Sequence, residues 1–310
     1  MLQFDLVGIG NPVYDIIVTP EVTTDGRILS GCSTNACLAA KRLGMKRVGM
    51  VGCVGRDFAE RFSHDMSNYG IEVSVDATGR ETGGFRLVYD ETGNRTLDVL
   101  GVAGKITAKT FPEDFLNSKF FLIGPILGEL DLELIEFLRS AASGILFLDP
   151  QGLVRLIGDG RRVIHICDRG QFRKIAGLVD FVKPNEPESE TITAQKDPIL
   201  ALKALRDLGA RVPIVTLAER GSLLLNDGHV CRIPAFATRA VDPTGAGDVY
   251  AGSFISEFAR TDDMVESALF ASAAASLMVE QIGPGFRMNR ETVLGRKGAI
   301  RDKLVTEAAI

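Results

Sequence analysis

The second half of the chain alternates short apolar runs with segments of helical periodicity, and this alternation limits the possible folds more than any other feature. The apolar runs have the length of strands and the segments between them have the length of helices: runs 120–123, 145–148, 178–183 and 212–216, and segments such as 130–142 and 198–208. Strands that alternate with helices usually form parallel sheets. We therefore predict an α/β fold, a doubly wound and mostly parallel sheet with helices on both faces.

The first half adds further strands and a more polar region. Runs 4–9, 47–54 and 71–75 predict strands, 57–69 predicts a helix that Asp57 caps, and the last twenty residues suggest a terminal helix with a loose end. Segment 16–29 and the pair 84–89 and 95–100, joined by a turn at 90–94, are too polar for the interior of a parallel sheet. They predict a small β structure beside the main sheet. Without an internal repeat or linker, residues 1–310 are expected to form one domain.

Composition excludes several classes of protein. The 310 residues carry a net charge of −5, which does not suggest a nucleic-acid backbone as partner. No apolar run reaches the roughly 18 residues of a membrane span, and the N-terminus resembles a strand rather than a secretion signal, so we expect a cytoplasmic protein. The five cysteines are scattered and predict free thiols, and the three histidines are too dispersed for a zinc site.

The run Asp-Pro-Thr-Gly-Ala-Gly-Asp at 242–248 carries the chemistry. Pro243 breaks the preceding segment, and from Asp248 onward small and apolar residues recur at helical spacing. The N–H groups of Gly245, Ala246 and Gly247 would then lie at the positive end of a helix, which suits an anion. Asp248 beside them fits a base that takes a proton from a hydroxyl. The alternative is a glycine-rich loop with an Asp that caps a helix.

This run resembles the signature of the ribokinase-like (PfkB) carbohydrate kinases, Asp-x-Thr-Gly-Ala-Gly-Asp. The resemblance extends from about residue 4 to residue 286. It implies that Asp248 is the catalytic base and that Gly245, Ala246 and Gly247 form the anion hole. It also implies a small β lid over the acceptor site, with lid segments at about 12–31 and 82–100.

The same resemblance implies residues that bind the acceptor. Asp15 follows the first strand, where the family uses an Asp to bind substrate hydroxyls. Gly31 and Asn35 match the family's Gly-Gly-x-x-x-Asn-x-Ala helix start, in which Ser30 replaces the first glycine. These residues, together with Asp248, are expected to bind the acceptor. The alternative for Asn35 is an ordinary polar residue in the first turn of a helix.

Nucleotide and metal residues follow two later strands. Asn185 and Glu188 are similar to the family's Asn-x-x-Glu motif, which implies that both act on Mg²⁺ through water. An Asn cap with an acidic first turn explains this pattern equally well. Thr216 and Gly221 match the family's nucleotide strand end, with Gly245 and Gly247 as further ATP contacts; Ala218 replaces a glycine there. The family's last loop, here 283–286, closes over adenine and, with the turn at 242–244, can hold a monovalent cation such as K⁺.

Two features give different indications about the acceptor. The stretch from Asp149 to Arg155 is similar to inositol-kinase members of the family, where Arg155 would reach the acceptor or a phosphate. A solvated helix residue is the alternative for Arg155. The triplet at 10–12, Gly-Asn-Pro, resembles nucleoside kinases. Gly8 and Gly10 do not predict a dinucleotide-binding motif, because Val13 occupies the position of the third glycine of GxGxxG.

Together these patterns predict an enzyme that uses ATP and Mg²⁺ to phosphorylate a hydroxyl of a small sugar, a polyol such as inositol, or a nucleoside. The chain contains no GxxxxGK[ST] run, so a P-loop is not the phosphate cradle. An adenosine or other nucleoside kinase is one alternative. A non-catalytic nucleotide- or metabolite-binding regulator on the same fold is another, although a regulator would need no base at Asp248. We expect a monomer or a homodimer, with no nucleic-acid or membrane partner.

Overall fold

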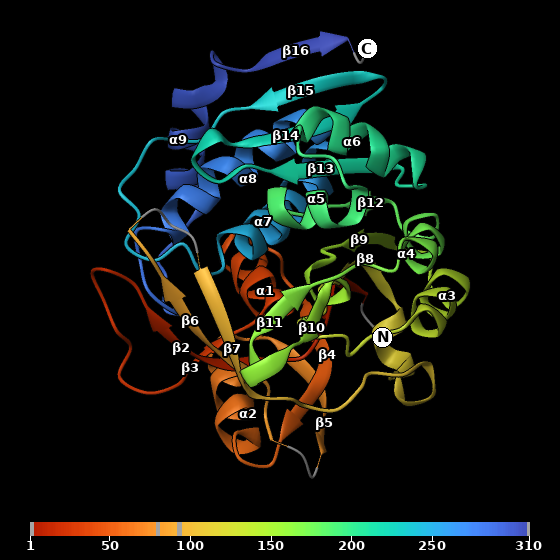
Figure 1. Cartoon of the computed structure of the whole chain (residues 1–310), viewed down its shortest axis with the longest axis vertical. Coiled ribbons are helices and arrows are strands. Elements are labelled where there is room, and N and C mark those ends of the chain that lie inside the picture. The colour runs from red at the N-terminus through yellow and green to blue at the C-terminus, as the bar shows by residue number, and fades with distance from the viewer. Residues whose placement is uncertain (1–2, 79–80, 92–94, 309–310) are drawn as a thin grey trace.

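The computed structural model describes residues 3–78, 81–91 and 95–308, and within them a ten-stranded sheet runs through the molecule (Figure 1). In spatial order its strands are β16 (Val305–Ala308), β15 (His229–Ile233), β14 (Ser222–Asn226), β13 (Val212–Thr216), β12 (Phe181–Val182), β9 (Ile145–Leu148), β8 (Ser118–Ile123), β1 (Phe4–Ile9), β4 (Val48–Gly55) and β5 (Glu72–Thr78). The strands from β13 to β5 are parallel, and β14, β15 and β16 are antiparallel. The predicted doubly wound, mostly parallel sheet is confirmed.

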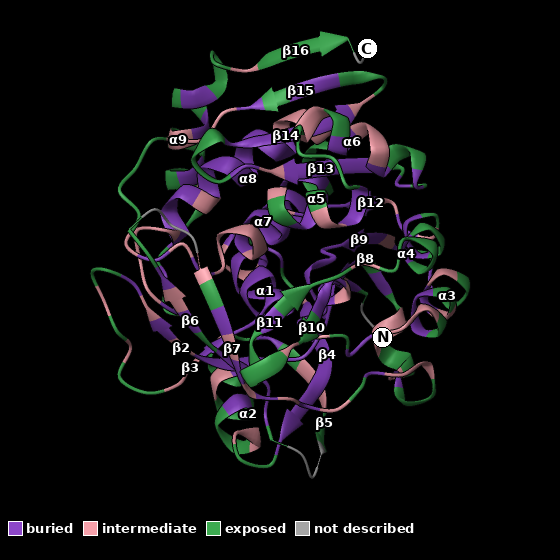
Figure 2. Cartoon of the chain, viewed as in Figure 1, coloured by how far each residue is buried: buried purple, intermediate pink, exposed green. Residues whose placement is uncertain are grey.

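Helices cover both faces of this sheet, because alternate residues of its strands point to opposite sides. In β1, for example, Leu6 packs into one core and Val7 into the other. The helices of the first core are α1 (Cys32–Arg42), α2 (Ala59–Asn68), α7 (Ala246–Thr261), α8 (Met264–Met278) and α9 (Arg290–Arg301). Those of the second are α3 (Leu132–Ala141), α4 (Arg169–Ala176), α5 (Glu186–Thr193) and α6 (Pro198–Asp207). Figure 2 shows the central strands buried between these layers.

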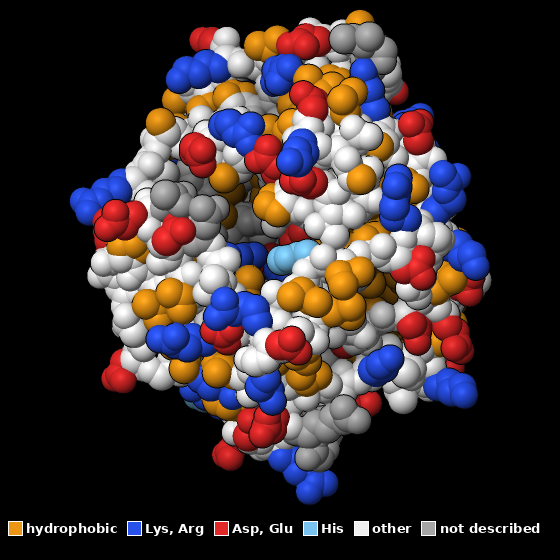
Figure 3. Space-filling model, viewed as in Figure 1, with side chains coloured by type: hydrophobic (Ala, Val, Ile, Leu, Met, Phe, Trp, Pro, Cys, Tyr) orange, Lys and Arg blue, Asp and Glu red, His pale blue; other side chains and the backbone are white. Residues whose placement is uncertain are grey.

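A second sheet lies to one side, and we call it the small sheet. Its order is β3 (Ile28–Ser30), β2 (Val13–Val18), β6 (Gly84–Tyr89) and β7 (Arg95–Gly101). The strands predicted in the two polar segments are present, whereas the turn predicted at 90–94 falls partly outside the described residues, at 92–94. A two-stranded ribbon, β10 (Arg155–Ile157) and β11 (Val163–His165), adjoins β7 through an ion pair of 2.5 Å between Arg162 and Asp98. Apolar side chains are exposed on this ribbon (Figure 3).

Three local predictions are wrong. Asp57 does not cap α2; its carboxylate accepts hydrogen bonds from the backbone and hydroxyl of Thr82, at 3.0 and 2.6 Å, and so ties α2 to the small sheet. Arg155 is not in a helix, since it begins β10 and is only 4% exposed. The last twenty residues are not simply a helix with a loose end, because β16 follows α9 and pairs with β15. Such pairing depends on distant residues and leaves no local pattern.

The close crossing of α1 and α7 brings the starts of both helices to one place. A Cβ on Gly252 of α7 would lie 2.1 Å from the carbonyl oxygen of Ala36 in α1, so the crossing requires a glycine there. The carboxyl ends of β1, β8, β9, β12 and β13 meet at the same edge of the sheet, as parallel strands must. In the described part of the chain, every helix is too short or too polar to cross a membrane.

Candidate active site

Asp248 lies in the first turn of α7, and two amide side chains hold its carboxylate. Asn35 of α1 donates from Nδ2 to Oδ2 at 2.9 Å, and Gln151 donates from Nε2 to Oδ1 at 3.3 Å. Neutral donors of this kind fix the orientation of a carboxylate without adding a charge beside it. Asp248 is therefore a positioned carboxylate, and among the described residues no ammonium or guanidinium group donates a hydrogen bond to it. Asn35, with its side chain 3% exposed, is more than an ordinary polar residue of the first turn.

The start of α7 has an open N-terminus. Its N-cap is Gly245, at φ 80°, which makes no side-chain capping hydrogen bond. The left-handed backbone favours glycine, and a Cβ at Gly245 would also lie 2.8 Å from Nδ2 of Asn35. Ala246 donates weakly to the carbonyl of Pro243, at 3.3 Å. No side chain of the described residues caps this first turn, so its N–H groups could donate to a ligand; their role as an anion hole stays a prediction.

The turn before α7 touches the small sheet. Asp242 is fully buried, and its Oδ1 accepts the backbone N–H of Thr244 at 2.9 Å while its Oδ2 has no hydrogen-bond partner. Burial raises the pKa of Asp242. The hydroxyl of Thr244 lies 3.0 Å from that of Tyr89 on β6, and Arg95 on β7 donates to the same tyrosine at 3.1 Å. The small sheet is thereby joined to the turn that precedes α7 and Asp248.

Asp15 lies on β2 and faces the junction of the two sheets. It is 3% exposed and accepts the backbone N–H of Phe85 at 2.7 Å. Burial raises the pKa of Asp15 to about 6, against the opposing effects of hydrogen bonds from Phe85 and Ser30 and of the charges of Arg27 and Arg155. Gly31, at φ 116°, is the N-cap of α1 and also lacks a side-chain cap. A second uncapped helix therefore begins at this site.

Arg155 lies close to both Phe85 of the small sheet and Glu188 of α5. It is buried, its Nη2 lies 3.9 Å from Oε1 of Glu188, and its Nη1 donates at 3.4 Å to the carbonyl of Ile126. Its Nε has no hydrogen-bond partner. Burial lowers the pKa of Arg155, as does the charge of Arg95, whereas the carboxylates of Glu188, Asp149 and Asp248 raise it. Because these contacts are long and Nε is unpaired, the buried guanidinium has N–H groups that can still bind an anion.

Asn185 and Glu188 form a complete capping box at the start of α5. Asn185 accepts the N–H of Glu188 at 2.9 Å, and Oε2 of Glu188 accepts the N–H of Asn185 at 2.9 Å. The cap predicted as an alternative is thus present. Oε1 of Glu188 is not used by the cap, and burial and the charge of Asp149 raise the pKa of this carboxyl. One buried carboxylate oxygen free of the cap fits a water-bound Mg²⁺, which prefers oxygen ligands.

Thr216 and Gly221 flank the end of β13. Thr216 forms a parallel β-bridge with Asn185, so the predicted nucleotide and metal residues are neighbours. Gly221, at φ 90°, ends a short 3₁₀ turn and packs so tightly that a Cβ would lie 1.9 Å from the carbonyl of Ile233. Ala218 adopts φ 52°, a left-handed conformation normally left to glycine.

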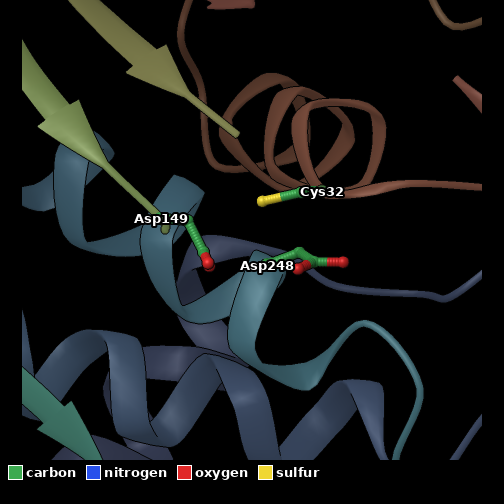
Figure 4. Close-up of side chains that lie close together, drawn as sticks. All are labelled: Cys32, Asp149 and Asp248. Atoms are coloured by element: carbon green, nitrogen blue, oxygen red, sulfur yellow. The ribbon is translucent and has the colours of Figure 1, made fainter. Parts of the chain in front are cut away.

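Three buried side chains of the site, those of Cys32, Asp149 and Lys183, have no role in the sequence prediction. Cys32, Asp149 and Asp248 point into one space from α1, the end of β9 and α7 (Figure 4), and their nearest ligand atoms lie within 4.8 Å of one another. Burial raises the pKa of the Cys32 thiol well above its usual range, so it is protonated at neutral pH. Lys183 pairs with Asp149 at 2.8 Å. Their place directly after parallel strands is the signal by which Asp149 and Lys183 could have been found.

The face in Figure 3 is hollowed between the small sheet and helices α5 and α7. A separate recess lies between the small sheet and the loop after β8, and it is lined by Phe85, whose backbone N–H donates to Asp15. Its lining is mainly backbone and apolar side chains, among them Val13, Phe85, Val102, Ile126 and Leu127. Glu129 also lines it, but both of its carboxylate oxygens already accept backbone N–H groups. Asn11 and Lys105 are the other polar residues of the lining, which is otherwise made of glycine and apolar residues.

Comparison with known proteins supports this geometry. The sequence matches the pfkB family carbohydrate kinases over residues 12–291. It is 31% identical to a cytidine kinase of Thermococcus kodakarensis over 266 residues, 83% of this chain and 90% of that protein. It is 27% identical to a nucleoside kinase of Methanothermobacter thermautotrophicus over 294 residues, 90% of each chain.

Solved structures show the same fold at lower identity. A pyrophosphate-dependent kinase of the ribokinase family, solved with a pyrophosphate analogue and myo-inositol, has a TM-score of 0.80 at 22% identity and covers 93% of this chain and 99% of its own. A ribokinase II from E. coli, solved with ATP and Mg²⁺, has a TM-score of 0.75 at 18% identity and covers 96% of this chain and 99% of its own. Because the family profile spans most of the sequence, the chain belongs to the pfkB family of carbohydrate kinases.

Proposed function

We propose that this kinase transfers the γ-phosphoryl group of ATP to a hydroxyl of a nucleoside, with a sugar or polyol as the broader class of acceptor. The observation that carries the proposal is the positioned carboxylate of Asp248 at an uncapped helix start, held by Asn35 at 2.9 Å. A base and an anion site in one helical turn are the two parts that phosphoryl transfer to a hydroxyl needs. A binding protein without catalysis would need only the second.

Each part of the site has a role in this proposal. Asp248 takes the proton of the attacking hydroxyl, and the amides of Gly245, Ala246 and Gly247 bind the oxygens of the transferring phosphoryl group. The hydroxyls beside the attacking one bind Asp15, Gly31 and Asn35, because a carboxylate accepts two hydroxyls well. Arg155 contacts the acceptor or the phosphoryl group. Thr216 and Gly221 belong to the part of the site that binds the nucleotide.

Ions complete the proposed site. Mg²⁺, held through water by Glu188 and Asn185, would neutralise charge on the phosphates of ATP. A monovalent cation such as K⁺ is proposed near the turn at 242–244, because Oδ2 of Asp242 is buried without a partner. Loss of activity in chelator, restored by Mg²⁺, is the expected result. Activity that survives in chelator would contradict the metal-assisted scheme.

The small sheet acts as a lid in this proposal. The contact between Tyr89 and Thr244 joins strand β6 to the turn before α7, so we expect ordering of this turn and closure of the lid to occur together. Closure excludes water, which would otherwise accept the phosphoryl group. Since the proposed site residues all lie on one chain, the enzyme can act as a monomer or a homodimer. We place it in the cytoplasm, where ATP is available.

The recess beside Asp15 favours a nucleoside over an inositol. An inositol presents hydroxyls around its whole ring, and the apolar side chains of the recess would leave many of them unpaired. A nucleoside presents ribose hydroxyls to Asp15 and a flat base to Phe85 and its neighbours. The cytidine kinase and nucleoside kinase relatives agree with this choice.

An ADP-release assay across cytidine, other nucleosides, ribose, hexoses and inositols, each with MgATP, tests the proposal. We expect the highest kcat/KM for a nucleoside. Activity on inositols alone would contradict the assignment of a nucleoside as acceptor but would agree with the assignment of the protein as a kinase. Binding of MgATP without phosphorylation of any member of the panel would favour the regulator.

A further inference from the structure

Lys183 is a fully buried lysine at the edge of the sheet where the candidate site lies. It directly follows β12, is 2% exposed, and its backbone N–H donates to the carbonyl of Leu148 at 2.9 Å. This register sets Lys183 beside Asp149, which directly follows the neighbouring strand β9. Its Nζ lies 2.8 Å from Oδ2 of Asp149. A buried lysine is costly unless it is paired, so this pair needs a reason to be there.

The ammonium group points toward the start of α7. A Cβ on Gly247 would lie 3.4 Å from Nζ of Lys183, so the amine lies beside the backbone of the proposed anion hole. Asp149, its partner, points into the space that Asp248 faces (Figure 4). The sheet thus brings a fixed cation to the same turn in which α7 presents uncapped N–H groups.

The pairing of Lys183 leaves it able to bind a further anion. An ammonium group has three N–H donors, and among the described residues Asp149 is its one carboxylate partner within 4 Å. Burial by itself would lower the pKa of Lys183, but the charges of Asp149 and Glu188 raise it above its ordinary value. The amine therefore keeps its charge in the absence of substrate.

We propose that Lys183, held in place by Asp149, contacts the transferring phosphoryl group and is a catalytic residue of this enzyme. The inference rests on the proposed function. In the step, the acceptor oxygen forms a bond to the γ-phosphorus while the bond from that phosphorus to the β–γ bridging oxygen breaks and releases ADP. The hydroxyl proton goes to Asp248. Lys183 gives up no proton; its charge offsets the negative charge on the phosphoryl oxygens in the transition state.

The test compares three variants. The first is the single variant Lys183→Met, the second is the double variant that combines Asp149→Asn with Lys183→Met and so removes both charges, and the third is Lys297→Met as a matched control. Lys297 is also a buried and paired lysine, 2.6 Å from Glu266 on the far side of the first core, so its loss reports what a buried ion pair contributes to stability alone. For each variant we would measure kcat, the KM of the acceptor, the KM of ATP, and the melting temperature. The double variant leaves no unpaired carboxylate and is the one expected to fold normally.

We expect both Lys183 variants to lose roughly 10²–10³-fold in kcat, as for one removed donor to a transition-state charge, with the KM of the acceptor nearly unchanged. Lys297→Met should lower the melting temperature and leave kcat unchanged. A folded double variant with kcat within threefold of wild type would overturn the role of Lys183. Failure of the wild-type enzyme to phosphorylate any acceptor would instead overturn the proposed function.

Discussion

Helices α5 and α7 both begin at the edge of the main sheet with an acidic residue in the first turn, yet they differ in whether a side chain caps their first N–H groups. At α5, Asn185 and Glu188 close a capping box around the first N–H groups. At α7, Gly245 supplies no side chain, and Asp248 turns instead to Asn35 and Gln151. The first arrangement stabilises its own helix, whereas the second leaves the helix start without a side-chain cap, as our proposal of a phosphoryl site with Asp248 as base requires.

The other described helices make this contrast sharper. The side chains that cap them are those of Asp131, Asp168, Asp197, Asp263 and Asn289, at α3, α4, α6, α8 and α9. Apart from α2, which begins after Phe58, the uncapped starts are those of α1 and α7, and both have glycine as N-cap. A side-chain cap contributes about 1 kcal/mol to stability. Helices α1 and α7, the two uncapped helices whose N-cap is glycine, are those that meet at the candidate site.

Asp248→Asn should have the largest effect on activity. The amide keeps the shape of the side chain but cannot accept the proton, so we expect kcat to fall roughly 10²–10⁴-fold. Isothermal titration should still show MgATP binding close to that of wild type. Phosphoryl transfer at the wild-type rate by this variant would mean that the open helix start at α7 serves binding only.

Gly245→Ala should have the next largest effect. At φ 80° and 2.8 Å from Asn35, the added Cβ must displace the amide that holds Asp248, and we expect kcat to fall about 10²-fold. Gly228→Ala is the matched control, since Gly228 has φ 76° and open space around it. Both variants should lose about 1 kcal/mol of unfolding free energy in urea melts. Equal kcat in the two variants would show that the contact between Gly245 and Asn35 does not matter.

The acceptor side should respond to pH. Asp15 has a pKa of about 6, so it loses its charge as the pH falls through 6, and the KM of the acceptor should rise about tenfold between pH 7 and pH 5. Because folding raises this pKa, the folded state favours the protonated form, and the contribution of Asp15 to stability is lost as the pH rises through 6. Asp15→Asn should therefore raise the melting temperature at pH 8. A KM for the acceptor that shows the same pH dependence in wild type and variant would contradict this role.

Removing a cap should have the smallest effect. Asn185→Ala and Asp197→Ala each remove an N-cap, from α5 and α6, and each should cost about 1 kcal/mol in thermal or urea unfolding. Asn185→Ala should also raise the Mg²⁺ concentration for half-maximal activity, and Asp197→Ala should not. Identical Mg²⁺ dependence in both variants would show that the capping box at α5 stabilises the helix and has no part in binding Mg²⁺.

Local patterns in the sequence predict most of the fold and part of the site. The apolar runs predict the parallel strands, and the motif at 242–248 predicts the glycine start of α7, because both depend on neighbouring residues. The pairing of β16 with β15, the ribbon that begins at Arg155 and the bond from Asp57 to Thr82 depend on residues far apart in the chain. The same holds for Gln151 and Lys183, whose contacts arise only when the sheet is formed.

The most direct test of the central claim is NMR of the protein labelled with ¹⁵N at Gly, Ala and Glu. The amide signals of Gly245, Ala246, Gly247 and Glu188 would be followed as MgADP, aluminium fluoride and the acceptor are added to mimic the transferring phosphoryl group. We predict the largest shifts for the three amides at the open start of α7 and a smaller shift for Glu188, which lies near the proposed Mg²⁺ but keeps its N–H bound to Asn185. A shift confined to Glu188, with the amides at 245–247 unchanged, would contradict the assignment of α7 as the phosphoryl site.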